Sequence, residues 1–243
     1  MKKRLDVLIV DRGLAGSREK AQRLILAGQV LIDGAPAGKP GRQVRDDVEI
    51  ALKEQLPFVG RGGLKLVEAL DRFEIEIEGR TAIDIGASTG GFTDCLLQRG
   101  TAFVIAVDVG KGQLDWGLRN DPRVTVMEGI NARYLKPDDL ERTPDLCVID
   151  VSFISLTKIL PAATQVLAET SDLITLIKPQ FEAGREQVGK GGVVKDPEVH
   201  KEVIERVRTF GTETLRLTWV DCIPSPIKGP AGNIEFLAHW QMS

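Results

Sequence analysis

The stretch Thr81-Ala-Ile-Asp-Ile-Gly-Ala-Ser-Thr-Gly-Gly, residues 81–91, decides the fold of the larger part of the chain. Residues 81–85 are predicted to form a buried strand. The glycines that follow permit a sharp turn whose backbone amides can approach a ligand closely. A helix that begins after such a turn directs its positive N-terminal end at that ligand. This order predicts the first unit of a doubly wound α/β sheet.

The sequence on the C-terminal side of this stretch continues the same alternation. Further strands are expected at residues 103–107, 124–127, 146–149 and 173–177. Two late strands, at 215–220 and 234–240, flank a loop rich in Pro and Gly, and no helix pattern fits between them. We therefore expect a mostly parallel, Rossmann-like sheet whose last strand is antiparallel and forms an edge hairpin.

The N-terminal residues predict a separate small α+β domain at 1–52. Leu5, Leu8 and Ile9 share one helical face, and Ser17 is a suitable N-cap for a second helix. Short strands are expected around Val30 and Ile50. Residues 53–63 are interpreted as a linker, and residues 64–243 as the large domain, which begins with a helix at 64–73.

Composition is that of an ordinary soluble globular protein, with 42% apolar and 28% charged residues among 243. The longest apolar runs are far shorter than the ~18 residues of a membrane span, and no secretory signal follows Met1. Three distant cysteines without CxxC spacing and only two histidines favour a reduced, cytoplasmic protein without a metal site.

Charge is distributed unevenly along the chain. Residues 1–60 carry eleven Lys and Arg against eight Asp and Glu, whereas the remainder carries 21 against 27. A basic module joined to an acidic one suggests that any nucleic-acid contact is local. A difference of a few charges can equally be noise, so both interpretations stay open.

Two cofactors use a glycine-rich loop followed by an acid at the end of the next strand. Asp108 lies 24 residues after Asp84 and can accept hydrogen bonds from both hydroxyls of a ribose. The loop lacks the GxGxxG pattern of dinucleotide folds, and a carboxylate at Asp84 can orient the amino-acid end of S-adenosylmethionine. Asn131 could bind the adenine edge or simply cap its loop. The expected cofactor-binding residues are Asp84, Gly86, Ala87, Ser88, Gly90, Gly91, Asp108, Val109, Asn131 and Asp150.

Four charged residues are expected at the carboxyl edge of the sheet. Asp150 and Lys178 end the fourth and fifth strands, Glu235 begins the last strand, and Lys65 lies on the helix before the first. Deprotonation of a weakly acidic hydroxyl during attack on a sulfonium methyl fits this set, with a buried lysine as proton acceptor. The alternative for any one of these residues is a purely structural role, in which the four form two ion pairs.

Longer strings resemble known families. Arg4-Leu-Asp, Gly13-Leu-Ala-Gly-Ser-Arg-Glu-Lys-Ala and Lys39-Pro-Gly resemble the αL RNA-binding motif of a small-subunit ribosomal protein and pseudouridine synthases. Asp84-Ile-Gly-Ala-Ser-Thr-Gly-Gly, Asp150-Val-Ser-Phe-Ile-Ser, Lys178-Pro-Gln-Phe-Glu and Gly232-Asn-Ile-Glu resemble the TlyA family, FtsJ-like 2′-O-methyltransferases also called haemolysin A. The match covers nearly the whole chain.

The resemblance implies a class I methyltransferase sheet and methylation of a cytidine ribose in ribosomal RNA. It implies a catalytic tetrad at Lys65, Asp150, Lys178 and Glu235, and a base-stacking role for Phe153. The expected RNA-binding residues are Arg4, Arg18, Lys20, Lys39, Arg61 and Phe153.

Members that act on both ribosomal subunits have a longer C-terminus. The chain ends eight residues after Glu235, so the large subunit is the expected partner. An RNA-binding ribosome assembly factor with vestigial methyltransferase activity and a membrane-active haemolysin are the alternatives.

Overall fold

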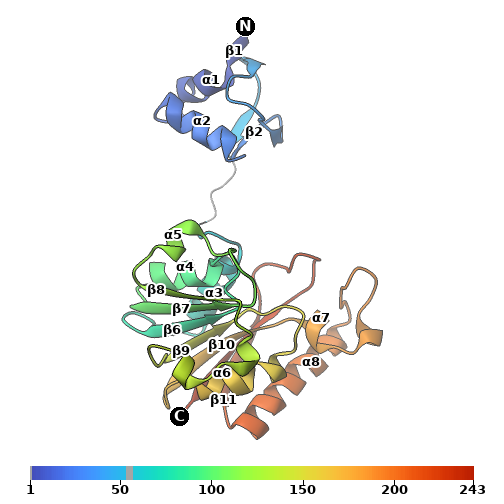
Figure 1. The fold of residues 1–243 in the computed structure, drawn as a ribbon. Coiled ribbons are helices and arrows are strands. Elements are labelled where there is room, and N and C mark those ends of the chain that lie inside the picture. The colour runs from blue at the N-terminus through green and yellow to red at the C-terminus, as the bar shows by residue number, and fades with distance from the viewer. Residues whose placement is uncertain (1, 53–56) are drawn as a thin grey trace. The chain divides into compact units, whose positions relative to one another are not determined.

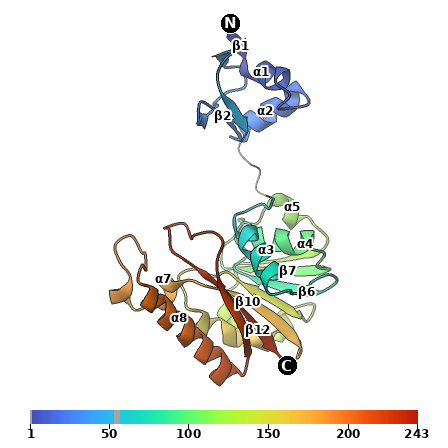
Figure 2. The ribbon, with the colours of Figure 1, turned by 180° about the vertical axis from the view of Figure 1, so that it is seen from behind.

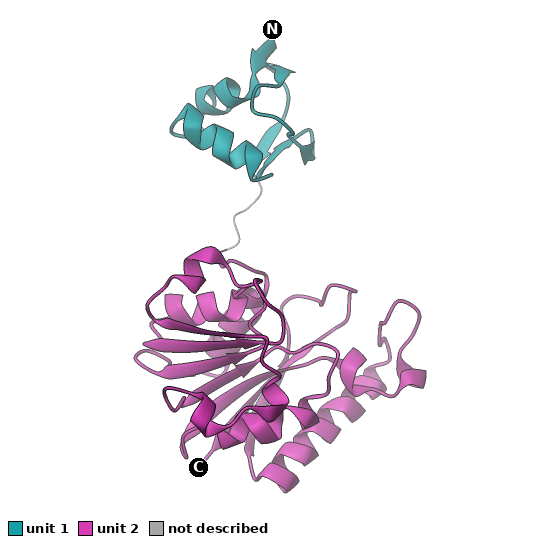
Figure 3. Ribbon diagram, in the orientation of Figure 1, with its two compact units in different colours: residues 1–56 teal, residues 57–243 magenta. Residues whose placement is uncertain are grey.

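The computed structural model describes residues 2–52 and 57–243 (Figure 1). The chain divides into two compact units, Met1–Leu56 and Pro57–Ser243 (Figure 3). Residues 53–56, the first part of the expected linker, lie outside the described residues. Each unit has its own buried apolar core, so each is described by itself.

The first unit packs two helices against short strands. Ser17 accepts a hydrogen bond from the amide of Lys20 at 3.2 Å, which confirms the predicted N-cap. Leu5, Ile9 and Val30 lie in its core. Its elements are β1 (Lys2–Arg4), α1 (Leu5–Asp11), α2 (Arg18–Leu26), β2 (Val30–Ile32), β3 (Ala35–Pro36), β4 (Gln43–Arg45) and β5 (Ile50–Leu52).

The second unit contains a seven-stranded sheet in the order β11-β12-β10-β9-β6-β7-β8. Only β12 runs antiparallel to its two neighbours, β10 and β11, which confirms the predicted sheet and its edge hairpin. The strands are β6 (Thr81–Ile85), β7 (Phe103–Asp108), β8 (Val124–Glu128), β9 (Leu146–Ile149), β10 (Ser171–Ile177), β11 (Thr218–Pro224) and β12 (Phe236–Met242).

Helices cover both faces of this sheet (Figures 1 and 2). One apolar cluster joins the sheet to α3 (Gly62–Arg72), α4 (Gly91–Gln98) and α5 (Trp116–Arg119). The opposite face packs on α6 (Leu160–Gln165) and α8 (Pro197–Thr209). The short helix α7 (Pro179–Glu182) follows β10 directly.

The late strands begin farther along the chain than the sequence predicts. A π-helical segment, Phe210–Thr214, prolongs α8, and Arg216 has a left-handed backbone with φ +58°. The strand expected at 215–220 therefore starts at Thr218, and the one expected at 234–240 starts at Phe236. Glu235 consequently lies in the loop just before β12 rather than at its start.

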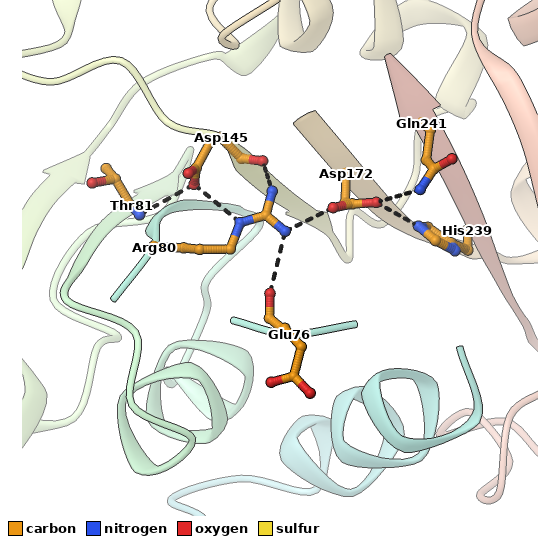
Figure 4. Close-up of polar contacts among 7 residues, drawn as sticks. All are labelled: Glu76, Arg80, Thr81, Asp145, Asp172, His239 and Gln241. Carbon is orange, nitrogen blue, oxygen red and sulfur yellow. Dashed lines mark hydrogen bonds and ion pairs between the residues drawn. The ribbon is translucent and has the colours of Figure 1, made fainter. Parts of the chain in front are cut away.

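An ionic network joins four central strands at the edge opposite the glycine-rich loop (Figure 4). Arg80, which precedes β6, bonds to Asp145 at 3.3 Å and to Asp172 at 2.7 Å. The buried ring of His239 donates from Nε2 to Asp172 at 2.8 Å, since an ionised carboxylate only accepts. Gln241 adds a bond to the same carboxylate at 3.3 Å. The network thus links the amino ends of β6, β9 and β10 to β12.

We predict that Asp172→Asn destabilises the protein in a pH-dependent way. Burial opposes ionisation of Asp172, but hydrogen bonds from His239 and Arg80 outweigh it and lower its pKa from 3.8 to about 2. This stabilisation is complete above the unfolded-state pKa and disappears as the pH falls towards 2. Urea unfolding should show a loss of about 2 kcal/mol at pH 7.

At pH 3, about half of that difference should be gone. Asp138 is exposed, so Asp138→Asn serves as the matched control. Its free energy of unfolding should equal that of the wild type at both pH values. A difference between Asp172→Asn and the wild type that is equal at pH 7 and pH 3 would contradict the prediction.

Candidate active site

A cavity of about 480 Å³ opens at the carboxyl ends of β6, β7 and β9. Parallel sheets bind their ligands at this edge. Ala87 and Gly91 line a smaller hollow of about 130 Å³ that shares Gly86, Ser88 and Asp150 with the cavity. The expected cofactor-binding residues that line the main cavity are Gly86, Ser88, Asp108, Val109, Asn131 and Asp150.

The glycine-rich loop is closely packed where it turns. Gly86 has φ +90°, and a Cβ there would lie 2.4 Å from the backbone oxygen of Asp150. Gly90 has φ +98°, and a Cβ there would lie 2.2 Å from Leu118. Both positions therefore require glycine, because a side chain would be strained and would clash. Gly90 lines neither hollow, so its contribution is to permit the turn of the loop.

Asp84 lies beneath this loop and is fully buried. Its Oδ2 accepts a hydrogen bond from the Thr93 hydroxyl at 2.7 Å, whereas Oδ1 has no partner among the described residues. Burial raises the pKa of Asp84 to about 7. The sequence predicted direct contact between Asp84 and a ligand, but Asp84 does not line the cavity. An orphaned buried oxygen at this place calls for a partner that a ligand or water could supply.

Asp108 and Asn131 occupy the wall of the cavity. Asp108 accepts hydrogen bonds from the amides of Ser88 at 2.8 Å and Gly110 at 2.6 Å, which fix its carboxylate. Carboxylate oxygens have further lone pairs, so ribose hydroxyls could still bind them. Asn131 accepts from the amide of Arg133 at 3.2 Å, so it does cap its loop while also lining the cavity.

The four charged residues form two ion pairs, in which both lysines are nearly buried. Lys178 Nζ lies 2.5 Å from Asp150, and Lys65 Nζ lies 2.6 Å from Glu235. Side-chain exposure is only 10% for Lys178 and 9% for Lys65. Lys178 has extended backbone angles, φ −111° and ψ 101°, as the following proline predicts. The expected juxtaposition of each lysine with its carboxylate is therefore present.

Two polar residues that the sequence did not single out complete this cluster. The Lys178 amine donates to Ser152 Oγ at 2.9 Å. Gln180, which follows Lys178 by two residues along the chain, donates to Glu235 at 3.4 Å. Their proximity to Asp150 and Lys178 in the sequence was the only available signal.

Comparison with known proteins identifies the second unit. Residues 58–242 match the family of FtsJ-like methyltransferases, and residues 3–50 match the S4 domain. The chain belongs to the FtsJ-like methyltransferase family. It is an α/β methyltransferase with an N-terminal S4 domain.

Similar proteins extend over almost the whole chain. A Mycobacterium tuberculosis 16S/23S rRNA (cytidine-2'-O)-methyltransferase, TlyA, is 48% identical over 96% of this chain and 87% of its own length. A Campylobacter jejuni 23S rRNA (cytidine-2'-O)-methyltransferase, also TlyA, is 32% identical over 95% of this chain and 96% of its own length. A solved structure from Streptococcus thermophilus, named as a candidate hemolysin, has a TM-score of 0.77 and 48% identity over 100% of this chain and 89% of that one.

The hemolysin name raises the question of membrane insertion. No helix within residues 2–52 or 57–243 is long and apolar enough to cross a bilayer.

Phe153 is the most exposed aromatic side chain beside the methyltransferase site. It is 91% exposed, has φ +64°, and packs on Phe181 with ring centroids 5.0 Å apart. Lys178 Nζ lies 5.9 Å from the centroid of the Phe181 ring. A non-glycine residue held in a left-handed conformation at a cavity edge is typical of functional sites. Arg61, another expected RNA-binding residue, bonds to the backbone oxygen of Lys228 at 3.3 Å.

The S4 domain gathers cationic side chains around one buried carboxylate. Asp6 accepts two bonds from Arg4, at 3.0 and 2.9 Å, one from Arg18 at 2.9 Å and one from Gln22 at 2.8 Å. The Arg4 guanidinium beside it holds the pKa of Asp6 well below its usual range, although burial opposes this. The remaining expected RNA-binding residues of the domain, Lys20 and Lys39, are exposed.

Proposed function

We propose that this FtsJ-like methyltransferase transfers a methyl group from S-adenosylmethionine to the ribose 2′-hydroxyl of a cytidine in ribosomal RNA of the large subunit. The observation that carries the proposal is the set of two ion pairs with buried lysines, one of whose carboxylates, Asp150, lines a cavity of nucleoside size. Cytidine and ribosomal RNA are the substrates in the names of the two TlyA relatives, and both names include 23S rRNA.

The cavity residues fit S-adenosylmethionine. Asp108 would bind the ribose hydroxyls, and Asn131 the adenine. The glycine-rich loop would lie against the amino-acid end, near the unpaired oxygen of Asp84. When bound, the cofactor supplies an electrophilic sulfonium methyl group. Solved methyltransferases described as dependent on this cofactor share the fold, with a TM-score of 0.53 at 12% identity in one case.

The catalytic step requires that the 2′-hydroxyl lose its proton as the new oxygen–carbon bond forms. In the proposed mechanism, the Lys178 ammonium first loses a proton to solvent, the neutral amine then accepts the hydroxyl proton at Nζ, and Asp150 holds the amine in place. Glu235 holds Lys65, which brings a second cation to the same edge and can stabilise the developing oxyanion. Phe153 would stack on the target base from its exposed position.

The S4 domain would supply RNA affinity without chemistry. Arg4 and Arg18 are held at one point by Asp6, and Lys39 is exposed in the turn before β4, the strand with which Arg4 pairs. Cationic side chains at fixed positions contact phosphates and set the register of a protein on its nucleic acid.

We predict that Asp108→Ala weakens binding of S-adenosylhomocysteine by at least about tenfold, because it removes acceptors for the ribose hydroxyls. Calorimetry would measure the affinity. The control is Asp138→Ala, which removes an exposed acid that does not line the cavity. If the wild type bound NAD and ignored S-adenosylhomocysteine, the proposed cofactor would be wrong.

Lys178→Ala should lower the single-turnover rate of methyl transfer by about 10²–10⁴-fold while leaving cofactor affinity unchanged. Lys178→Arg should not restore the rate, because guanidinium does not deprotonate at accessible pH. Tritiated cofactor and separated ribosomal subunits are the reagents, and mapping of the modified nucleotide identifies the target. A near-wild-type rate for Lys178→Ala would remove this lysine from the mechanism.

The triple variant Arg4→Ala, Arg18→Ala, Lys39→Ala should bind ribosomal subunits more weakly and with a flatter salt dependence. Each lost phosphate contact reduces the slope of log K against log salt by about one unit at most. Filter binding over a salt series measures both quantities. The control is Arg45→Ala, whose side chain is exposed and paired with Asp47. Unchanged affinity and slope in the triple variant would refute the assignment of these residues.

A further inference from the structure

We propose that Ser152 is a positioning residue that directs the amine of Lys178 towards the substrate hydroxyl. The proposal rests on the proposed function, because it concerns the same lysine. Ser152 Oγ accepts a hydrogen bond from Lys178 Nζ at 2.9 Å, on the amine that Asp150 also contacts at 2.5 Å. The amine therefore has two different acceptors.

The two acceptors lie on the wall of the cavity. Asp150 and Ser152 both line it, whereas Lys178 does not and is nearly buried. Lys178 follows the end of β10, and its amine contacts both of these cavity-lining side chains. The centroid of the Phe181 ring lies 5.9 Å from Nζ, within the range of a cation–π contact.

The geometry of an amine nitrogen gives this arrangement its consequence. A lysine nitrogen has four tetrahedral positions, of which one holds the carbon stem. Asp150 and Ser152 each fix one N–H, so a single position is left. In the neutral amine that position holds the lone pair, which must point at the 2′-hydroxyl proton. With one acceptor alone, the lone pair could occupy either of the two remaining positions, and only one of them points at the hydroxyl.

The two acceptors differ in what they contribute. Asp150 is an anion and attracts the amine strongly, whatever the direction in which the lone pair points. Ser152 is neutral, exposed and adds little charge stabilisation, so its contribution is mainly directional. Its own hydroxyl proton has no acceptor among the described residues, so the hydroxyl can rotate to present a lone pair to the lysine.

The test is a double-mutant cycle on single-turnover methyl transfer to ribosomal subunits, using wild type, Ser152→Ala, Lys178→Ala and the double variant. Ser152→Ala should lower the rate by about tenfold. Affinities for S-adenosylhomocysteine and for the subunits should stay unchanged, as should the unfolding midpoint. In the Lys178→Ala background, Ser152→Ala should cause no further loss, because the amine it directs is absent.

Two further variants separate the hydroxyl from the loop. Ser152→Thr keeps the hydroxyl and should restore most of the rate. Ser155→Ala is the matched control, because it removes a hydroxyl from the same loop that bonds to Glu182 and not to Lys178. It should keep the wild-type rate.

The possible results distinguish this inference from the proposed function. A near-wild-type rate for Ser152→Ala, with Lys178→Ala slow, would overturn the role of Ser152 alone. So would an equal loss in both lysine backgrounds, a failure of Ser152→Thr to restore the rate, or an equal loss in Ser155→Ala. A fast Lys178→Ala variant would remove this lysine from the mechanism and overturn this inference with it. A wild type that methylates no ribosomal RNA would overturn the proposed function itself.

Discussion

The register between β9 and β10 is the constraint on which the site depends. Thr175 pairs with Ile149, so both strands end at the same edge and release Asp150 and Lys178 there. A buried lysine without a partner would be costly, and so would a buried carboxylate. Pairing makes each tolerable, and the Lys65–Glu235 pair does the same for a lysine that arrives from α3. Because removal of one partner leaves the other charge buried and uncompensated, these residues depend on one another.

The opposite edge of the sheet explains how this register is held. Arg80 bonds to Asp145 and Asp172, which lie at the amino ends of β9 and β10, and His239 joins β12 to the same carboxylate. Strands that are fixed at their amino ends do not need ion pairs at their carboxyl ends to hold their register. The carboxyl edge can therefore hold charged side chains for chemistry, while the amino edge holds charged side chains for stability. A site built on such fixed strands keeps its geometry better than one built on loops alone.

Most of the sheet and the residues at its edge could be predicted from the sequence, because both follow from periodicity and chain order. A buried parallel strand is a short apolar run, and the residue after it must lie at the carboxyl edge. That reasoning found Asp150 and Lys178 without structural information. It failed where local geometry overrides the pattern: the π-helical segment after α8 displaces the start of β11, and no apolar period reveals it. Ser152 and Gln180 were missed because a serine in a loop and a glutamine in a short helix are ordinary, and only the distances to the lysine and to Glu235 mark them.

The S4 domain organises its cations by the same physical means as the methyltransferase site. Asp6 is fully buried, yet it stays ionised because two guanidinium groups and an amide bond to it. An arginine that is already held loses less side-chain freedom when it meets a phosphate. The carboxylate therefore favours binding by reducing the conformational entropy that is lost. It also offsets one positive charge, so it weakens long-range attraction to RNA. The two effects change the affinity in opposite directions. Selectivity is nevertheless increased, since fixed guanidinium groups fit only phosphates with the matching separation. In both units, therefore, a buried or half-buried carboxylate sets the position of a cation, and position rather than net charge decides what that cation can bind.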